Sequence, residues 1–226
     1  EAEANGYLAA FPNQHSIDDH VEEILAIGMQ AVLDKNQAFL EAVLDYSIER
    51  GADPSKTYLL GYGSGSVWAQ SMACRLSARF AAFAFVSGTI ATTLLDDCAP
   101  ERFPSILMIH GTDDTSIPYS GMKNWYGLSF NLASFSETEA HWAGLGNCGT
   151  TPELTLIPDN DPEDGTISSR TVRTDCTNGQ NVESIVVQNG SHTYPGGVFP
   201  TTFSVSQDFN ANAVALEFFT NHPATP

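Results

Sequence analysis

Residues 57–66 read Thr-Tyr-Leu-Leu-Gly-Tyr-Gly-Ser-Gly-Ser, an apolar run followed by a tight, glycine-rich turn. The run over 57–61 predicts a strand, and the turn predicts an abrupt passage into a helix over about residues 66–76. Similar apolar runs alternate along the chain with stretches of helical periodicity: the runs are 83–87, 105–110 and 184–188, and the helical stretches about 30–50 and 208–221. This alternation is typical of a doubly wound, mostly parallel α/β sheet, which binds ligands at the carboxyl ends of its strands.

The remaining segments carry weaker signals. Residues 6–11 predict a buried strand that Pro12 ends, and residues 122–143 predict one or two helices. The polar stretch 149–182 predicts only a short strand, at 153–157. We therefore expect a single domain over residues 1–226, with 122–182 as an insertion or cap-like region. Residues 1–4, Glu-Ala-Glu-Ala, are expected to be an expression remnant of a trimmed yeast secretion leader.

The charge of the chain is strongly negative. Its 226 residues hold 9 Lys and Arg against 27 Asp and Glu, a formal net charge of −18. Such a surface repels phosphate backbones and anionic lipid, so we expect neither a nucleic acid nor a membrane as partner. No apolar run reaches the roughly 20 residues of a spanning helix.

The four cysteines are Cys74, Cys98, Cys148 and Cys176. None forms a Cys-x-x-Cys pair or has a histidine at zinc-ligand spacing, so we expect no metal site. The even count favours two disulfides, Cys74–Cys98 and Cys148–Cys176, among the three pairings that four cysteines allow. Disulfides imply an oxidising compartment, and we expect a secreted protein.

Polar residues follow three of the predicted strands. The turn 61–66 holds Ser64, Gly111-Thr112-Asp113-Asp114 follows the strand 105–110, and Asn189-Gly190-Ser191-His192 follows the last strand. Serine, aspartate and histidine in this order are the order of the α/β-hydrolase triad. His192 would act as general base, an aspartate would orient it, and a serine would attack an acyl carbon.

Here the chain resembles the secreted polyhydroxybutyrate depolymerase and feruloyl esterase group of α/β-hydrolases. The most specific motifs are His110-Gly111-Thr112-Asp113-Asp114 with Ile117-Pro118-Tyr119, and Gly190-Ser191-His192-Thr193-Tyr194-Pro195-Gly196-Gly197. The likeness runs through 32–39, 53–87, 104–119, 142–148 and 184–219. It implies hydrolysis of carboxylic esters without a cofactor, with Asp114 rather than Asp113 as the acid and His192 as the base. It also supports both disulfides.

The register of the glycine-rich turn departs from the family. Relatives read Gly-x-Ser-x-Gly, and Gly61 matches the first glycine, so the nucleophile position falls on Gly63 and the chemistry is lost. A shift by one residue would make Ser64 the nucleophile, with the Gly65 amide helping to hold the oxyanion, but would place Tyr62 and Ser66 where small residues belong. The resemblance thus implies a catalytically impaired esterase-like protein that retains binding of a small ester, an aromatic acid, or a polymeric or glycan ligand. The alternative is an active carboxylesterase using Ser64, Asp114 and His192 on feruloyl, acetyl or hydroxyalkanoate esters.

The start of the chain is a second departure. Relatives carry a strand and a His-Gly oxyanion loop before the segment that resembles 6–12, so we expect an N-terminally truncated sheet. A missing upstream segment or partner chain would supply the strand, or residues 6–11 would move inward, with Asn13 or Gln14 as oxyanion donor.

Other patterns have ordinary interpretations. The turn 61–66 lacks the Lys-Ser/Thr of a nucleotide-binding loop. The histidines and acids between His15 and Glu23 favour a solvated helix start over a metal cluster. Trp125, Trp142 and Tyr194 are weak candidates for a substrate cleft, and the two tryptophans could equally pack under the insertion.

Overall fold

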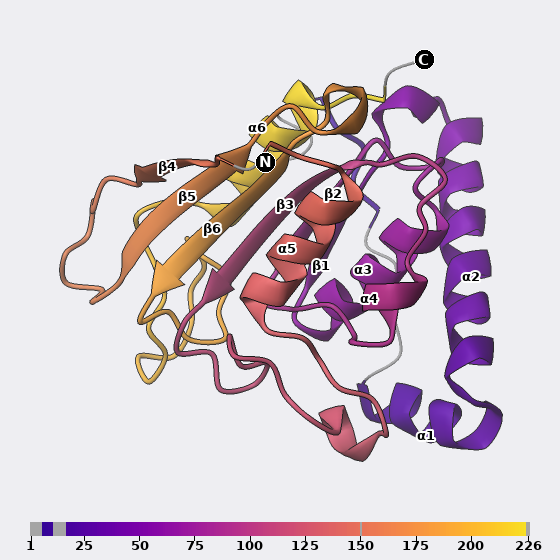
Figure 1. Cartoon of the computed structure of the whole chain (residues 1–226), viewed down its shortest axis with the longest axis horizontal. Coiled ribbons are helices and arrows are strands. Elements are labelled where there is room, and N and C mark those ends of the chain that lie inside the picture. Colours follow the sequence, from indigo (N-terminus) through magenta and orange to yellow (C-terminus); the bar gives the residue numbers. More distant parts are fainter. Residues whose placement is uncertain (1–5, 11–16, 150, 225–226) are drawn as a thin grey trace.

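The computed structural model describes residues 6–10, 17–149 and 151–224, with side chains from residue 22 onward in the second of these segments. These residues form a sheet with helices against both faces (Figure 1). The helices are α1 Ile17–Ile27, α2 Met29–Glu49, α3 Ser64–Arg75, α4 Leu94–Asp97, α5 Phe135–Leu145 and α6 Ala211–Asn221, with 3-10 turns at Pro54–Lys56, Trp125–Gly127 and Thr177–Gly179. The strands are β1 Tyr58–Tyr62, β2 Ala82–Val86, β3 Ser105–Gly111, β4 Glu153–Leu156, β5 Ile167–Arg173 and β6 Val182–Gln188.

The sheet has the order β1-β2-β3-β6-β5-β4. Strands β1, β2, β3 and β6 are parallel, whereas β5 and β4 pair antiparallel beyond β6. The predicted α/β architecture with a mostly parallel, doubly wound sheet is therefore confirmed. Because β1, β2, β3 and β6 run in the same direction, the turns that follow them meet at one edge of the sheet.

The core is divided by the sheet into two layers. Phe83, Phe85 and Met108 face α2, α3 and α5, whereas the alternate residues Ala84 and Leu107 face α6. Strands β2 and β3 are buried along their whole length because helices cover both of their faces. Continuous apolar runs such as 106–109 follow from this double burial.

Three predictions for individual segments were wrong or incomplete. Residues 6–10 form no strand; the Tyr7 hydroxyl lies 2.7 Å from the Thr220 hydroxyl, so the segment is anchored against α6. Phe11 lies outside the described residues. In the region 122–143, where one or two helices were predicted, the structure has the 3-10 turn Trp125–Gly127 and the helix α5, and Met122 and Leu132 pair as an isolated bridge.

Strand β5 was missed in the polar stretch 149–182. Its polar residues have partners within the sheet: the Arg170 Nε donates to Glu183 on β6 at 2.9 Å. Strands β4 and β5 thus extend the main sheet. Polarity alone predicted a loop, because an ion pair between neighbouring strands leaves no apolar pattern.

Both predicted disulfides are confirmed. Cys74 at the end of α3 is bonded to Cys98 after α4, and Cys148 after α5 is bonded to Cys176. Among the described residues, no helix has the length and apolar content needed to cross a membrane.

Candidate active site

The turn between β1 and α3 is built on two glycines. A Cβ on Gly61 would lie 2.4 Å from the Gly65 carbonyl oxygen, so only glycine lets the first turn of α3 approach the strand so closely. Gly63 has φ +57° and ψ −125°, a conformation that side-chain-bearing residues adopt only under strain. A sharp, strained turn from strand to helix is the geometry of a nucleophile elbow.

The loops that follow β3 and β6 interlock at the same edge. A Cβ on Gly111 would lie 2.2 Å from the Gly190 carbonyl oxygen, and that oxygen accepts the Asp113 N–H at 2.9 Å. The Asn189 N–H donates to the Thr112 hydroxyl at 2.8 Å. These contacts hold the segment containing His192 against the segment containing Asp114.

Asp114 and His192 form a hydrogen-bonded pair. The imidazole Nδ1 lies 2.7 Å from Asp114 Oδ2, while Oδ1 accepts the N–H groups of Ser116 and Ile117, each at 2.8 Å. The Asp114 side chain is fully buried, and that of His192 is 20% exposed. A buried carboxylate on Nδ1 fixes the ring with Nε2 available for proton transfer, which is the role of the acid in a hydrolase triad. The neighbouring Asp113 is exposed and contacts only Thr112 by a side-chain hydrogen bond among the described residues.

The residue that faces the free side of His192 is Gly63. A Cβ on Gly63 would lie 3.0 Å from His192 Nε2 and 3.4 Å from Cε1. Ser64 is the first residue of α3, and no hydrogen bond between the described side chains joins it to His192. The backbone N–H groups of Ser64 and Gly65 lie in the first helical turn, where no intrahelical acceptor exists, so they can donate to an anionic oxygen.

Two residues beside the pair were missed by the sequence analysis. The Tyr62 hydroxyl donates to the His192 carbonyl oxygen at 3.1 Å, and the two rings lie 5.3 Å apart. Burial, with a smaller contribution from Asp114, raises the pKa of Tyr62 above its ordinary value, so this phenol remains a donor. The place of Tyr62 between two glycines of the turn, Gly61 and Gly63, is the sequence feature that could have identified it as a residue of the site.

The second missed residue is His110, which is fully buried with its Nε2 atom 4.0 Å from Asp114 Oδ2. Its Nδ1 donates to the Gly111 carbonyl oxygen at 3.0 Å. Burial lowers the pKa of His110, although that hydrogen bond and Asp114 oppose the shift. Burial thus favours the neutral form of His110, whose ring packs behind the Asp114 carboxylate.

The three aromatic cleft candidates occupy different environments. Trp142 is completely buried, with its indole N–H donating to Gln70 at 3.1 Å and its ring 5.9 Å from Phe85, so it belongs to the core. Trp125 is 1% exposed and lines an apolar hollow of about 340 Å³ between α1, α2 and α3. Tyr194 has its ring 5.5 Å from that of Tyr62, and its hydroxyl donates to Asn212 at 2.7 Å.

The described residues contain no group of three or more His, Cys, Asp or Glu arranged to hold a metal ion. The cluster between His15 and Glu23 falls mostly outside the described side chains.

Known proteins resemble this chain in sequence and in structure. NocK of Nocardia uniformis subsp. tsuyamanensis, which is described as a putative esterase, is 27% identical over 176 residues, which cover 74% of this chain and 51% of NocK. An acetyl xylan esterase from Aspergillus awamori superposes with a TM-score of 0.52 at 16% identity, over 82% of this chain and 67% of that chain. The chain has an esterase-like α/β-hydrolase fold.

A variant of SOBER1 from Arabidopsis thaliana superposes with a TM-score of 0.46 at 12% identity, over 85% of this chain and 66% of that chain. No family model matches the chain. The chain spans about half the length of NocK, the curated relative that it matches.

Proposed function

We propose that this chain is an esterase-type α/β-hydrolase domain in which glycine occupies the nucleophile position, so that it binds ester or carboxylic acid ligands without hydrolysing them efficiently. One observation carries the proposal: the residue whose Cβ position lies 3.0 Å from His192 Nε2 is Gly63, which has no side chain. A hydrolase that lacks its nucleophile cannot form an acyl-enzyme, whatever the quality of its base.

The proposed ligand is a small ester, an aromatic acid such as a ferulate, or the equivalent group on a polymer or glycan. The same edge of the sheet offers the N–H groups of Ser64 and Gly65 to a carbonyl or carboxylate oxygen. The disulfides and the charge of −18 support a secreted protein that acts outside the cell.

A second candidate is an active serine carboxylesterase in which Ser64 attacks. The intact Asp114–His192 hydrogen bond favours it, because a pair oriented in this way serves a general base. For this reaction α3 would have to begin one residue later, so that the Ser64 hydroxyl reaches His192 Nε2.

Labelling with a fluorophosphonate, followed by intact mass and peptide mapping, separates the two candidates. Our proposal expects no adduct on the wild-type chain and an adduct on residue 63 of a Gly63→Ser variant measured beside it. An adduct on wild-type Ser64 would overturn the proposal in favour of the active esterase. Ligand binding is tested by titrating methyl ferulate while observing the His192 ring by NMR; an unchanged spectrum would refute retained binding.

A further inference from the structure

The side of the His192 ring that faces Gly63 carries a basic nitrogen open to solvent. Nδ1 is hydrogen-bonded to Asp114 Oδ2 at 2.7 Å, so the neutral ring keeps its proton there and Nε2 is an acceptor. Nε2 makes no hydrogen bond with any described residue, and it is not one of the described polar atoms that are buried without a partner. The Nε2 atom of His110, beside the same carboxylate, is buried in that way. Of these two histidines, His192 is therefore the one that can take a proton from a molecule in solvent.

Gly63 leaves room for a small molecule beside this nitrogen. Apart from the chain neighbours of Gly63, the described heavy atoms within 4 Å of its Cβ position are Nε2 and Cε1 of His192, at 3.0 Å and 3.4 Å. A serine would place its hydroxyl in this space, whereas glycine leaves the space to solvent. A water molecule can therefore approach Nε2 to the roughly 2.7–3.2 Å of a hydrogen bond.

The hydroxyl groups around His192 hold its backbone instead of contacting Nε2. Tyr62 donates to the His192 carbonyl oxygen at 3.1 Å, and Ser87 donates to the Thr193 carbonyl oxygen at 2.9 Å. Among the described residues, no hydroxyl group is hydrogen-bonded to Nε2. These contacts orient the base before a ligand arrives, and they leave water as the molecule that it can activate.

We propose that the Asp114–His192 pair activates water directly and hydrolyses aryl esters slowly, without an acyl-enzyme. This inference rests on the proposed function, because it takes Gly63 as the nucleophile position. The water oxygen forms a bond to the acyl carbon while one water proton passes to His192 Nε2, which gives a tetrahedral oxyanion. The bond from the acyl carbon to the phenolic oxygen then breaks, the proton on Nε2 passes to that oxygen, and a carboxylic acid and a phenol leave.

The mechanism restricts the substrates to esters with a good leaving group. Water is held by a hydrogen bond and not by the chain, so most of the advantage of a fixed nucleophile is lost. A phenolate leaves more readily than an alkoxide because a phenol is the stronger acid. The N–H groups of Ser64 and Gly65, in the first turn of α3, can stabilise the charge that develops on the carbonyl oxygen. We therefore expect turnover of phenyl esters and binding of methyl esters with little turnover.

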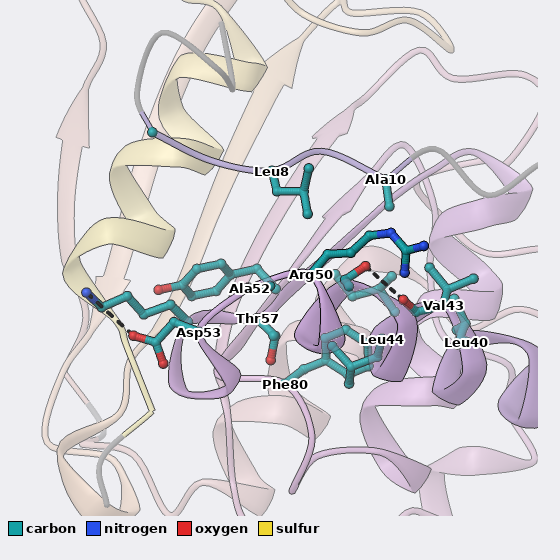
Figure 2. Close-up of a pocket in the computed structure, with 16 residues that line it drawn as sticks. Leu8, Ala10, Leu40, Val43, Leu44, Arg50, Ala52, Asp53, Thr57 and Phe80 are labelled. Carbon is teal, nitrogen blue, oxygen red and sulfur yellow. Dashed lines mark hydrogen bonds and ion pairs between the residues drawn. The ribbon is translucent and has the colours of Figure 1, made fainter.

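The hollow shown in Figure 2 offers no comparable base. It has a volume of about 570 Å³ beside α2 and the start of β1, and none of the described residues that line it is a histidine. Its Ser47 hydroxyl donates to the Val43 carbonyl oxygen at 2.8 Å, and its Lys56 amine is paired with Asp53. Lys56→Gln removes this amine and is therefore the control for consumption of an ester in the hollow.

Hydrolysis of p-nitrophenyl acetate by the wild-type chain tests the inference. His192→Ala should lower kcat/KM by about 100-fold or more, the usual contribution of a positioned general base. Lys56→Gln should leave it within about twofold. Gly63→Ala puts a methyl group into the space for water and should lower it by about tenfold or more. The matched control for backbone strain is Gly179→Ala, at φ +72° with nothing within 4 Å of its Cβ position, which should keep the wild-type rate.

Intact mass and peptide mapping of the wild-type protein, quenched with acid during turnover, identify the attacking group without any variant. We expect no acetyl group on His192 or Ser64 and no burst of p-nitrophenol, because water attacks the ester directly. An acetyl group on His192 would assign the attack to the ring and overturn the inference. Equal rates for wild type and His192→Ala would also overturn it, while the proposed ligand binding would stand. An acetyl group on Ser64 would refute both the inference and the proposed function.

Discussion

The Nε2 atom of His192 lies 3.0 Å from the point that a Cβ atom would occupy on Gly63. The distance is shorter than an ordinary carbon–nitrogen contact, so a side chain at this position requires the ring to shift by a few tenths of an ångström. The His192 side chain is 20% exposed, and its side-chain hydrogen bond among the described residues is at Nδ1, on the side of the ring away from Gly63. The site therefore places a hydrogen-bonded aspartate–histidine pair beside a position without a side chain.

Gly63→Ser should create or raise ester hydrolysis. The serine hydroxyl would lie within hydrogen-bonding reach of His192 Nε2, in the strained backbone conformation typical of nucleophile elbows. The measurement is kcat/KM on p-nitrophenyl acetate, and the control is Gly63→Ala, which imposes the same backbone strain without a hydroxyl. Equal rates for the two variants, in folded protein, would contradict the assignment of Gly63 as the nucleophile position.

Asp114→Asn should remove most of the activity that Gly63→Ser creates. An asparagine cannot stabilise the imidazolium and favours the wrong tautomer, a change that costs roughly 10⁴ in turnover in triad enzymes. The matched control is Asp113→Asn at the exposed neighbour, which should leave the rate within about twofold, as surface changes usually do. Similar losses in both variants would mean that Asp114 has no special role.

Breaking the Cys74–Cys98 disulfide should lower the free energy of unfolding. This bond closes a loop with a sequence separation of 24 residues, for which loop-closure entropy predicts about 3 kcal/mol. The test is urea denaturation of the double variant Cys74→Ala/Cys98→Ala. The corresponding variant without Cys148–Cys176, a loop of separation 28, should lose a similar amount. A loss below about 1 kcal/mol in both would show that the reduced chain is already constrained.

Lowering the pH from 7 to 5.5 should destabilise the protein in part through His110. Burial lowers the pKa of this group in the folded state, so the unfolded chain binds more protons below a pH of about 6.5, and stability falls as the pH falls. His110→Asn retains a donor toward the Gly111 carbonyl oxygen but removes the titration. Its unfolding free energy should therefore vary less steeply with pH, by up to about 1.4 kcal/mol per pH unit.

His141, whose pKa is also lowered by burial, provides a comparison for this experiment. His141→Gln should retain the His110 contribution to the pH dependence. An identical slope for wild type and His110→Asn would contradict a buried, neutral His110.

The sequence by itself determined the strands and helices that surround the site. Parallel strands buried on both faces favour unbroken apolar runs, and these are readable at 83–86 and 106–109. The pairing of the cysteines was also predictable, because partners close in sequence lay on neighbouring elements. The predictions for two weakly patterned segments were wrong. Strand β5 was not predicted, because it is polar and Arg170 on it is paired with Glu183. Residues 6–10 were predicted as a strand because they are largely apolar, but they form none.

Only the tertiary structure decided which atoms meet. The sequence allowed either Gly63 or Ser64 to face His192, and one residue of register along a tight turn changes which of them does so. The position of His192 depends on contacts between loops 78 residues apart in the chain, from Asp114 to His192. The place of β1 at one end of the described sheet likewise follows from strand order, because a strand carries the same sequence pattern with one neighbour as with two. Pairing across a sheet and the direction of a turn depend on long-range packing, and no local periodicity encodes them.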